Sequence, residues 1–427
     1  MEYGKALRFH RVKQGLTQNQ LADGIISSAY LSKIENDQTV PAIEVLELLY
    51  ERLGIDINES ALNHPSKEKL KEWYEAIVLK RSEDATRLQD ELLQQKNMLN
   101  NHQLYVFYEL FRIRYLLLEG NVEEAYEAWK NIKQHKDTFD EEMAFYYHLI
   151  TGLVKYYKGD FDDSVHELTA AKETFSSVDI ERWEISDLYY LLSLSTSQAF
   201  QGSASVFYAE QALDMYQSQY DLSRSADCHI ILGINYSRLR NYNKSLENYH
   251  LARKIALQTN DLEQLKFAYN NIGVLEARFD NHKASIDNYL KSLEYAFDSE
   301  APQNLYELLN TIHGLIIEYY KLGDYEGCAH WIEEGKSKLK DFSSKAHELH
   351  FEFYQRLITN KPNLSIYLED EVIPFFQERN NYYYIIRYAV FLADLLEKQR
   401  MYKKSSSYLR LAIELLNKHS QLGGIYL

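Results

Sequence analysis

The sequence predicts an all-α protein in two parts, a small domain of short helices followed by a long array of helical hairpins. Residues that cap helices stand directly before two short apolar segments near the N-terminus. Farther on, small and bulky residues recur with a period of about 40 residues, which is typical of stacked hairpins. We expect the first domain over residues 1–63, a linker over residues 64–70 and the repeat domain over residues 71–427.

The first domain is expected to contain two short helices joined by a tight turn. Thr17 is a good N-cap, and Gln20 completes the capping-box pattern T-x-x-Q, which predicts a helix from Gln18 to about Gly24. Ser27 can cap a second helix over about residues 28–36. Two such helices packed on a preceding helix form a helix-turn-helix, whose second helix presents its N-terminal residues to the major groove of DNA. Those residues are Ser28, Ala29, Ser32 and Lys33.

Charge is distributed unevenly along the chain. The net charge of −16 argues against a general nucleic-acid coat and against binding to an anionic membrane surface. Within residues 1–36, however, lysine and arginine outnumber the acidic residues and gather in the first predicted helix. We therefore expect a DNA-contacting tip on an acidic body. Arg8 and Arg11 are expected to bind phosphates, Lys33 a guanine edge and Ala29 a thymine methyl group.

The repeat is clearest where RNYNKSLENY (residues 240–249) aligns with DNHKASIDNY (residues 280–289). The small residue at the centre of this string, here called the anchor, moves from Ser245 to Ser285. Two of the intervals between successive anchors are about twice the period, so each is expected to contain one additional, degenerate unit, near Ser205 and near Ser365. The array then holds about nine units. The remaining anchors are Ala85, Ala125, Ser164, Cys328 and Ser405.

Each clear unit also has a small residue twelve positions before the anchor and a bulky residue four after it. Gly233 and Tyr249 take these places around Ser245, and Gly273 and Tyr289 take them around Ser285. The pattern is that of tetratricopeptide-like hairpins, in which small residues let helices pack closely. We therefore expect a right-handed superhelix with a concave groove lined by the first helix of each unit.

A set of polar and aromatic residues is expected to line this groove. An asparagine amide offers a donor and an acceptor together, so Asn270 and Asn310 could both pair with the backbone of an extended peptide. Alternatively, either asparagine could cap a turn or bond a neighbouring helix. Two asparagines on one face, about 40 residues apart, favour a ligand. The other expected lining residues are Asp227, His313, Tyr190, Phe267 and Arg114.

Enzyme, metal and cofactor sites are not expected. The string HELH over residues 347–350 lacks the H-E-x-x-H spacing that places two histidine ligands and a glutamate base on one helix face. Cys228 and Cys328 are interpreted as buried, reduced thiols. No apolar segment approaches the roughly 18 residues of a membrane-spanning helix, and the N-terminal stretch lacks an apolar signal segment, so a cytoplasmic location is expected.

The string T-Q-x-x-L-A … L-S-K-I-E-N-x-x-x-x-P, ending at Pro41, resembles the DNA-binding domain of the phage-repressor superfamily (lambda, 434 and Cro). The resemblance implies that Gln18 contacts the DNA backbone and supports the recognition helix. It also implies that Ser28, Ala29 and Lys33 face bases and that Asn36 lies near a phosphate. This recognition helix departs from the pattern because it has no arginine or glutamine for a bidentate base contact.

The helix-turn-helix joined to about nine repeats resembles the peptide-pheromone regulators of Gram-positive bacteria, the Rap/Rgg, NprR, PlcR and PrgX group. The resemblance implies a quorum-sensing transcription regulator whose groove, partly through asparagines, holds a short reimported signalling peptide. Peptide binding would change the homo-oligomer, a homodimer or homotetramer, and its binding to a double-stranded DNA operator. Some members also bind a phosphorelay response regulator and block or reverse its phosphorylation, so a protein-binding scaffold is the alternative function.

Overall fold

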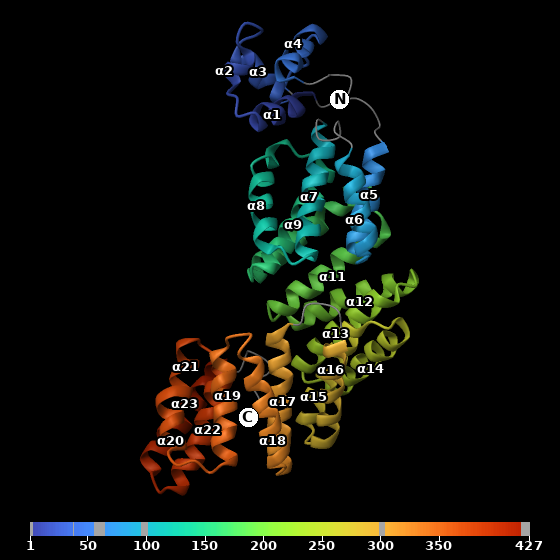
Figure 1. Ribbon diagram of the computed structural model, residues 1–427. Coiled ribbons are helices and arrows are strands. Elements are labelled where there is room, and N and C mark those ends of the chain that lie inside the picture. The colour runs from blue at the N-terminus through green and yellow to red at the C-terminus, as the bar shows by residue number, and fades with distance from the viewer. Residues whose placement is uncertain (1–2, 37, 55–64, 95–100, 299–303, 420–427) are drawn as a thin grey trace. The chain divides into compact units, whose positions relative to one another are not determined.

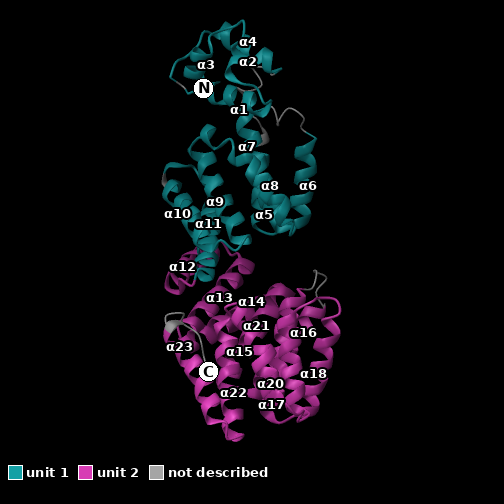
Figure 2. Cartoon of the chain, turned by 90° about the vertical axis from the view of Figure 1, so that its left-hand side faces the viewer, with its two compact units in different colours: residues 1–199 teal, residues 200–427 magenta. Residues whose placement is uncertain are grey.

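The computed structural model describes residues 3–36, 38–54, 65–94, 101–298 and 304–419, and within these ranges its regular structure is helical, without a strand (Figure 1). The all-α prediction is confirmed for this part of the chain. The chain divides into two compact units, residues 1–199 and residues 200–427 (Figure 2). None of the described helices combines the length and the apolar character that crossing a bilayer requires.

The first unit begins with four short helices around a small apolar core in which Leu7, Leu21, Leu31 and Leu49 are fully buried. The second and third of these are the two predicted helices. The second ends at Ala22 rather than near Gly24, whose left-handed φ of +69° cannot continue a helix. The four helices are α1 (Tyr3–Lys13), α2 (Gln18–Ala22), α3 (Ser28–Glu35) and α4 (Ile43–Leu53).

The rest of the first unit consists of helices arranged mostly as hairpins. The prediction of a linker over residues 64–70 is wrong for residues 65–70, which form the first turns of α5. Leu70 and Trp73 are fully buried on one face of this helix, so the segment belongs to the packed array despite its polar composition. The helices are α5 (Pro65–Val78), α6 (Ser82–Leu93), α7 (His102–Leu118), α8 (Val122–Lys133), the 3-10 turn η2 (Lys136–Thr138), α9 (Glu141–Tyr157), α10 (Phe161–Thr174), the 3-10 turn η3 (Phe175–Ser177) and α11 (Arg182–Gln198).

The second unit continues the array with helices that pack on their neighbours in sequence. They are α12 (Gly202–Ser218), α13 (Leu222–Arg238), α14 (Tyr242–Thr259), α15 (Leu262–Arg278), α16 (His282–Asp298), α17 (Leu305–Leu322), α18 (Tyr325–Lys338), α19 (Lys345–Ile358), α20 (Leu364–Tyr367), the π-turn η4 (Leu368–Val372), α21 (Ile373–Glu378), α22 (Tyr382–Lys398) and α23 (Tyr402–His419). In both units the buried residues lie between successive helices, as expected for stacked hairpins.

The anchors join the two helices of a hairpin. The Ser245 hydroxyl donates to the carbonyl oxygen of Gly233 at 2.6 Å, and the Ser285 hydroxyl donates to that of Gly273 at 2.8 Å. Ser164 and Cys328 make the same contact with the carbonyl twelve residues earlier. The anchors of the clear units are therefore small because a backbone carbonyl lies directly against them. All are buried: Ala85, Ala125, Ser164, Ser245, Ser285, Cys328 and Ser405.

The two degenerate units differ from each other. Ser205 is fully buried and accepts a hydrogen bond from the Asn235 amide at 2.9 Å. In this unit the anchor is therefore a small, buried residue that contacts the neighbouring helix, as predicted. Ser365 is only half-buried and lies in a short helix that passes through the π-turn η4 into α21. The prediction of an anchor near Ser365 is therefore wrong, because the second helix of this unit is broken into three pieces.

In the units anchored at Ser164, Ser245 and Ser285, the glycine is required by the bulky residue on the facing helix. A Cβ atom added at Gly233 would lie 2.6 Å from Cδ1 of Tyr249, well inside van der Waals contact. We expect Gly233→Ala to lower the free energy of unfolding by about 1–3 kcal/mol through overpacking, reduced by the roughly 0.5–1 kcal/mol that alanine gains in a helix. Thermal or urea unfolding of the whole protein measures this difference.

Gly202→Ala is the matched control, because its added Cβ would have its nearest neighbour at an ordinary 3.5 Å. Equal stability changes in the two variants would show that the Gly233–Tyr249 contact does not limit packing.

Candidate functional site

Both helices of the helix-turn-helix begin at the predicted caps, α2 at Thr17 and the recognition helix α3 at Ser27. The Thr17 hydroxyl accepts from the backbone N–H of Gln20 at 3.2 Å, and the Gln20 side chain accepts in return from the Thr17 N–H at 2.8 Å. The Ser27 hydroxyl accepts from the N–H of Tyr30 at 3.2 Å. Along α3, Ala29 and Lys33 are exposed and Ser28 and Ser32 are half-buried. The four side chains proposed to face DNA are thus accessible in the described structure.

A buried carboxylate holds α1, α2 and α3 together. Glu35 is 2% exposed and accepts from Arg11 Nε at 2.6 Å and from Arg11 Nη2 at 2.8 Å. Gln18 Nε2 donates to the same carboxylate at 2.8 Å. Gln18 therefore supports the recognition helix through Glu35. The prediction that Arg11 binds a phosphate is corrected, because its guanidinium forms a bidentate internal ion pair and also donates to the Leu16 carbonyl.

Other residues of α1 contact the hairpin array of the same unit. Arg8 Nη2 lies 3.3 Å from Asp137 Oδ2 in η2, in an exposed ion pair, and a phosphate contact of Arg8 stays a prediction. Next to it, Phe9 is fully buried, with its ring centroid 4.5 Å from that of His102 in α7. Asn36 caps the end of α3, where its amide donates to the Ser32 carbonyl at 2.8 Å, and a phosphate contact of Asn36 stays a prediction.

Arg114 does not line an open groove. It is 6% exposed, and Asp187 in α11 accepts from Nη1 at 2.6 Å and from Nη2 at 2.8 Å. The Tyr74 hydroxyl accepts a further bond from Nη1 at 2.9 Å. The prediction that Arg114 binds a peptide is therefore corrected: this ion pair connects α5, α7 and α11 inside the first unit.

Three other residues that were predicted to line the groove are not brought together in one pocket. Asp227 in α13 is 9% exposed and accepts from Gln264 Nε2 at 2.9 Å. His313 in α17 is 4% exposed and stacks on the His350 ring at 4.2 Å between centroids. Burial lowers the pKa of His313 well below its usual value, which keeps the ring neutral. Tyr190 is half-buried in α11, in the first unit. The groove-lining predictions for Asp227 and His313 are therefore corrected.

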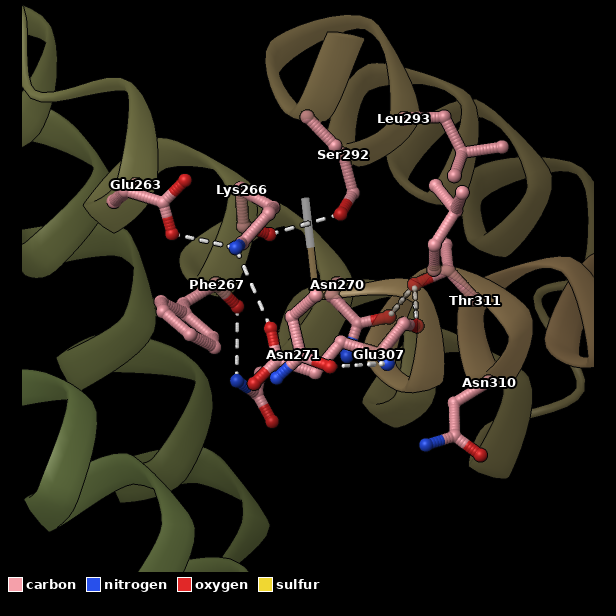
Figure 3. A pocket seen from close by; sticks show the side chains of 13 residues that line it. Glu263, Lys266, Phe267, Asn270, Asn271, Ser292, Leu293, Glu307, Asn310 and Thr311 are labelled. Atoms are coloured by element: carbon pink, nitrogen blue, oxygen red, sulfur yellow. Dashed lines mark hydrogen bonds and ion pairs between the residues drawn. The ribbon is translucent and has the colours of Figure 1, made fainter. Parts of the chain in front are cut away.

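The remaining three, Phe267, Asn270 and Asn310, line one pocket in the second unit (Figure 3). The pocket encloses about 220 Å³ between α15, α16 and α17. It combines an aromatic ring and apolar side chains with amides and charged groups, as small-ligand sites do. Sequence reasoning missed these further lining residues: Glu263, Lys266, Asn271, Ser292, Leu293, Ala296, Asn304, Glu307, Leu308 and Thr311.

Charged side chains at one edge of this pocket neutralise each other in part. Lys266 Nζ lies 2.5 Å from Glu263 Oε2 and 3.3 Å from Glu307 Oε2, and it sits over the Phe267 ring at 4.6 Å from the centroid. Lys266 and Glu307 could have been found from the sequence, since Glu263 precedes Lys266 by one helical turn and Glu307 precedes Asn310 by one turn. The edge carries one more negative than positive charge.

The asparagines of the pocket are held by neighbouring side chains. The Thr311 hydroxyl donates to Asn270 Oδ1 at 3.0 Å, and His347 Nε2 lies 3.1 Å from Asn310 Oδ1. His347 thus contacts the pocket from α19 through Asn310. The other histidine of the HELH string, His350, bonds the Tyr388 hydroxyl at 2.5 Å. Among the described residues no cluster of side chains is arranged to hold a metal ion.

Comparison with known proteins gives family matches to the N-terminal helices and to the first helices of the array. The family model described as helix-turn-helix matches residues 7–60. The model described as response regulator aspartate phosphatase H, N terminal, matches residues 66–120. The transcriptional activator NprA of Geobacillus stearothermophilus is 36% identical over 404 residues, which cover 93% of this chain and 98% of NprA.

Solved structures share the fold. The apo form of the quorum sensor NprR from B. thuringiensis has a TM-score of 0.71 and 19% identity, covering 82% of this chain and 98% of that one. NprR in complex with its cognate peptide NprX has a TM-score of 0.60 and 19% identity, covering 83% and 99%. The likeness confirms the predicted array of helical repeats.

Proposed function

The chain belongs to the family of the transcriptional activator NprA, and we propose that it is a cytoplasmic regulator of transcription that responds to a short peptide. Residues 1–63 bind a double-stranded DNA operator, and the repeats from residue 71 onward bind the peptide and mediate self-association. The single observation that carries the proposal is the meeting of Asn270, Asn310 and Phe267 in one pocket, in a chain that also exposes Lys33 on α3.

The chemistry of the pocket suits an extended peptide. A buried peptide must satisfy its backbone N–H and C=O groups, and asparagine amides at successive repeats can meet them at intervals along the chain. Phe267, Leu293 and Leu308 can cover apolar side chains of such a ligand. The structural neighbour NprR was solved with a cognate peptide, which supports this ligand class.

The DNA-bound form is proposed to be a symmetric homodimer or homotetramer. One recognition helix covers only a few base pairs, so helix-turn-helix proteins commonly bind two half-sites about one turn of DNA apart. A peptide in the repeats can change DNA binding only by the difference in its affinity for the two oligomeric arrangements.

Lys33→Ala is expected to weaken binding to an operator selected from random DNA by about 1–3 kcal/mol, because an exposed lysine on α3 can donate to a guanine edge. Binding to unselected DNA should change much less. Lys254→Ala, which removes an exposed lysine of α14, is the matched control and should leave both affinities unchanged. Fluorescence anisotropy at fixed salt measures the two affinities. Equal losses of affinity for the operator and for unselected DNA would show that Lys33 contacts a phosphate and not a base.

Asn270→Ala and Asn310→Ala are each expected to weaken peptide binding about ten-fold or more, because each leaves a buried peptide group without a partner. The probe is the tightest-binding heptapeptide selected from a random library, and the measurement is calorimetric titration. The control is Asn288→Ala, which removes an asparagine of α16 that bonds the carbonyl of Ala284 in its own helix. If both pocket variants bind the heptapeptide like the unmodified protein, the ligand site lies elsewhere.

A second candidate function is binding of a phosphorelay response regulator, with inhibition or reversal of its phosphorylation. The observation that favours it is the match of residues 66–120 to the N-terminal part of a response regulator aspartate phosphatase. We assign no catalytic residue to this activity. Pulldown of purified response regulators with and without the heptapeptide distinguishes this function from DNA regulation alone.

A further inference from the structure

The Asn310 amide faces the pocket in one orientation, and its role there rests on the proposed peptide-binding function. Asn310 is exposed at the pocket, so packing does not fix its side chain. Within the described residues, the polar group that contacts it is Nε2 of His347, 3.1 Å from Oδ1. An amide oxygen only accepts, so Nε2 must carry the hydrogen and donate it.

The His347 ring is itself rigidly held. It is 2% exposed and meets the Tyr306 ring edge-on at 5.4 Å between centroids. Its Nδ1 lies 2.7 Å from the Ser344 hydroxyl, which can rotate to donate to it. Burial also lowers the pKa of His347 to about 4, so a neutral ring with hydrogen on Nε2 and an acceptor at Nδ1 satisfies both neighbours.

With its oxygen engaged by His347, the Asn310 side chain has its nitrogen left for a ligand. Figure 3 shows the amide nitrogen of Asn310 on the side of the other labelled pocket residues and the oxygen on the opposite side. The amide oxygen of Asn270, one repeat earlier, is also engaged, because it accepts a hydrogen bond from the Thr311 hydroxyl. The Thr311 hydroxyl also reaches the Glu307 carbonyl at 3.2 Å, so its single hydrogen is shared and the Asn270 amide is less firmly oriented.

We propose that His347 is a positioning residue that turns the Asn310 amide so that the pocket presents an N–H donor to a carbonyl oxygen of the bound peptide backbone. The sequence alone suggested a side chain able to donate and accept at once. The structure narrows this to a donor, and it makes a backbone carbonyl rather than a backbone N–H the group bound at this point.

A thioamide scan of the selected heptapeptide tests the direction of this bond. Exchanging one backbone oxygen for sulfur makes the carbonyl a poorer acceptor and the attached N–H a better donor. At the position that Asn310 contacts, we expect the thioamide to weaken binding about three- to ten-fold, the equivalent of one hydrogen bond. That weakening should disappear in Asn310→Ala, which identifies the position.

Two substitutions of His347 separate positioning from a merely structural role. His347→Leu removes the donor, so the thioamide penalty at that position should shrink or vanish. His347→Gln can place an amide N–H near the same point and should restore the penalty. If His347→Leu does not fold, Asn310→Asp serves instead, because it replaces the donor by an acceptor and should abolish the same penalty.

The outcomes are distinct. A thioamide that tightens binding, with the gain lost in Asn310→Ala, would overturn the donor assignment while leaving peptide binding intact. Equal effects of His347→Leu and His347→Gln at every peptide position would overturn the positioning role. If no library heptapeptide binds the unmodified protein, the proposed function itself is wrong, and this inference falls with it.

Discussion

Asp187→Ala is expected to destabilise the first unit by about 3–5 kcal/mol, because it leaves the Arg114 guanidinium buried without its counter-ion. Only 8% of the Arg114 side chain and 1% of the Asp187 side chain are exposed, so water cannot replace the lost contact. Tyr74 alone would remain as a neutral partner. Since total stabilities are commonly about 5–15 kcal/mol, the loss should be visible as a large fall in the urea midpoint.

Two controls make this prediction specific. Asp163→Ala breaks an exposed ion pair with Lys155 in the same unit and should change stability little. The double variant Arg114→Leu, Asp187→Leu removes both charges, and it should recover much of the loss because two apolar side chains need no partners. If Asp187→Ala unfolds like the unmodified protein but binds the heptapeptide weakly, Arg114 belongs to the ligand site after all.

Glu35→Ala is expected to abolish DNA binding by unfolding the N-terminal helices rather than by removing a DNA contact. The buried carboxylate accepts three hydrogen bonds, two from Arg11 and one from Gln18. Removing one partner of such a pair costs about 3–5 kcal/mol, most of what a small domain has. Hydrogen exchange should show loss of protection in α1–α4 while the repeats keep theirs.

Glu47→Ala is the matched control, since Glu47 is exposed on α4 in the same domain. It should retain both protection and operator binding. A Glu35→Ala protein that keeps its exchange protection but loses operator binding would contradict the structural role and return Arg11 to the DNA interface.

The repeat array and the caps of the two helix-turn-helix helices were predictable because each is a local property. The Gly233–Ser245–Tyr249 set lies within one hairpin, where the Ser245 hydroxyl meets the Gly233 carbonyl and the Tyr249 ring occupies the space a Cβ would need. Thr17 with Gln20 is a bond between residues three apart. Fixed spacing in sequence therefore gives fixed geometry in space, whatever the rest of the chain does.

The pocket was partly predictable for the same reason. Asn270 lies three residues before Gly273 and Asn310 six before Ile316, the residues whose carbonyls meet the anchors, and both positions fall on one face of the first helix of a hairpin. The repeat period does not predict the structure at Ser365. The π-turn that follows this residue breaks the helix, and the spacing of residues in the sequence does not indicate such a break.

What the sequence by itself determined is thus the helix-turn-helix, the repeat and the shared face of two asparagines. Only the tertiary structure decided which charged and polar side chains remain available to a ligand. Arg11 is paired with Glu35 and Arg114 with Asp187, and these partners lie 24 and 73 residues away in the chain. An arginine has the same appearance in sequence whether it faces DNA or a buried carboxylate. The difference comes from desolvation, which makes a buried ion pair obligatory, and only packing determines which charges are buried.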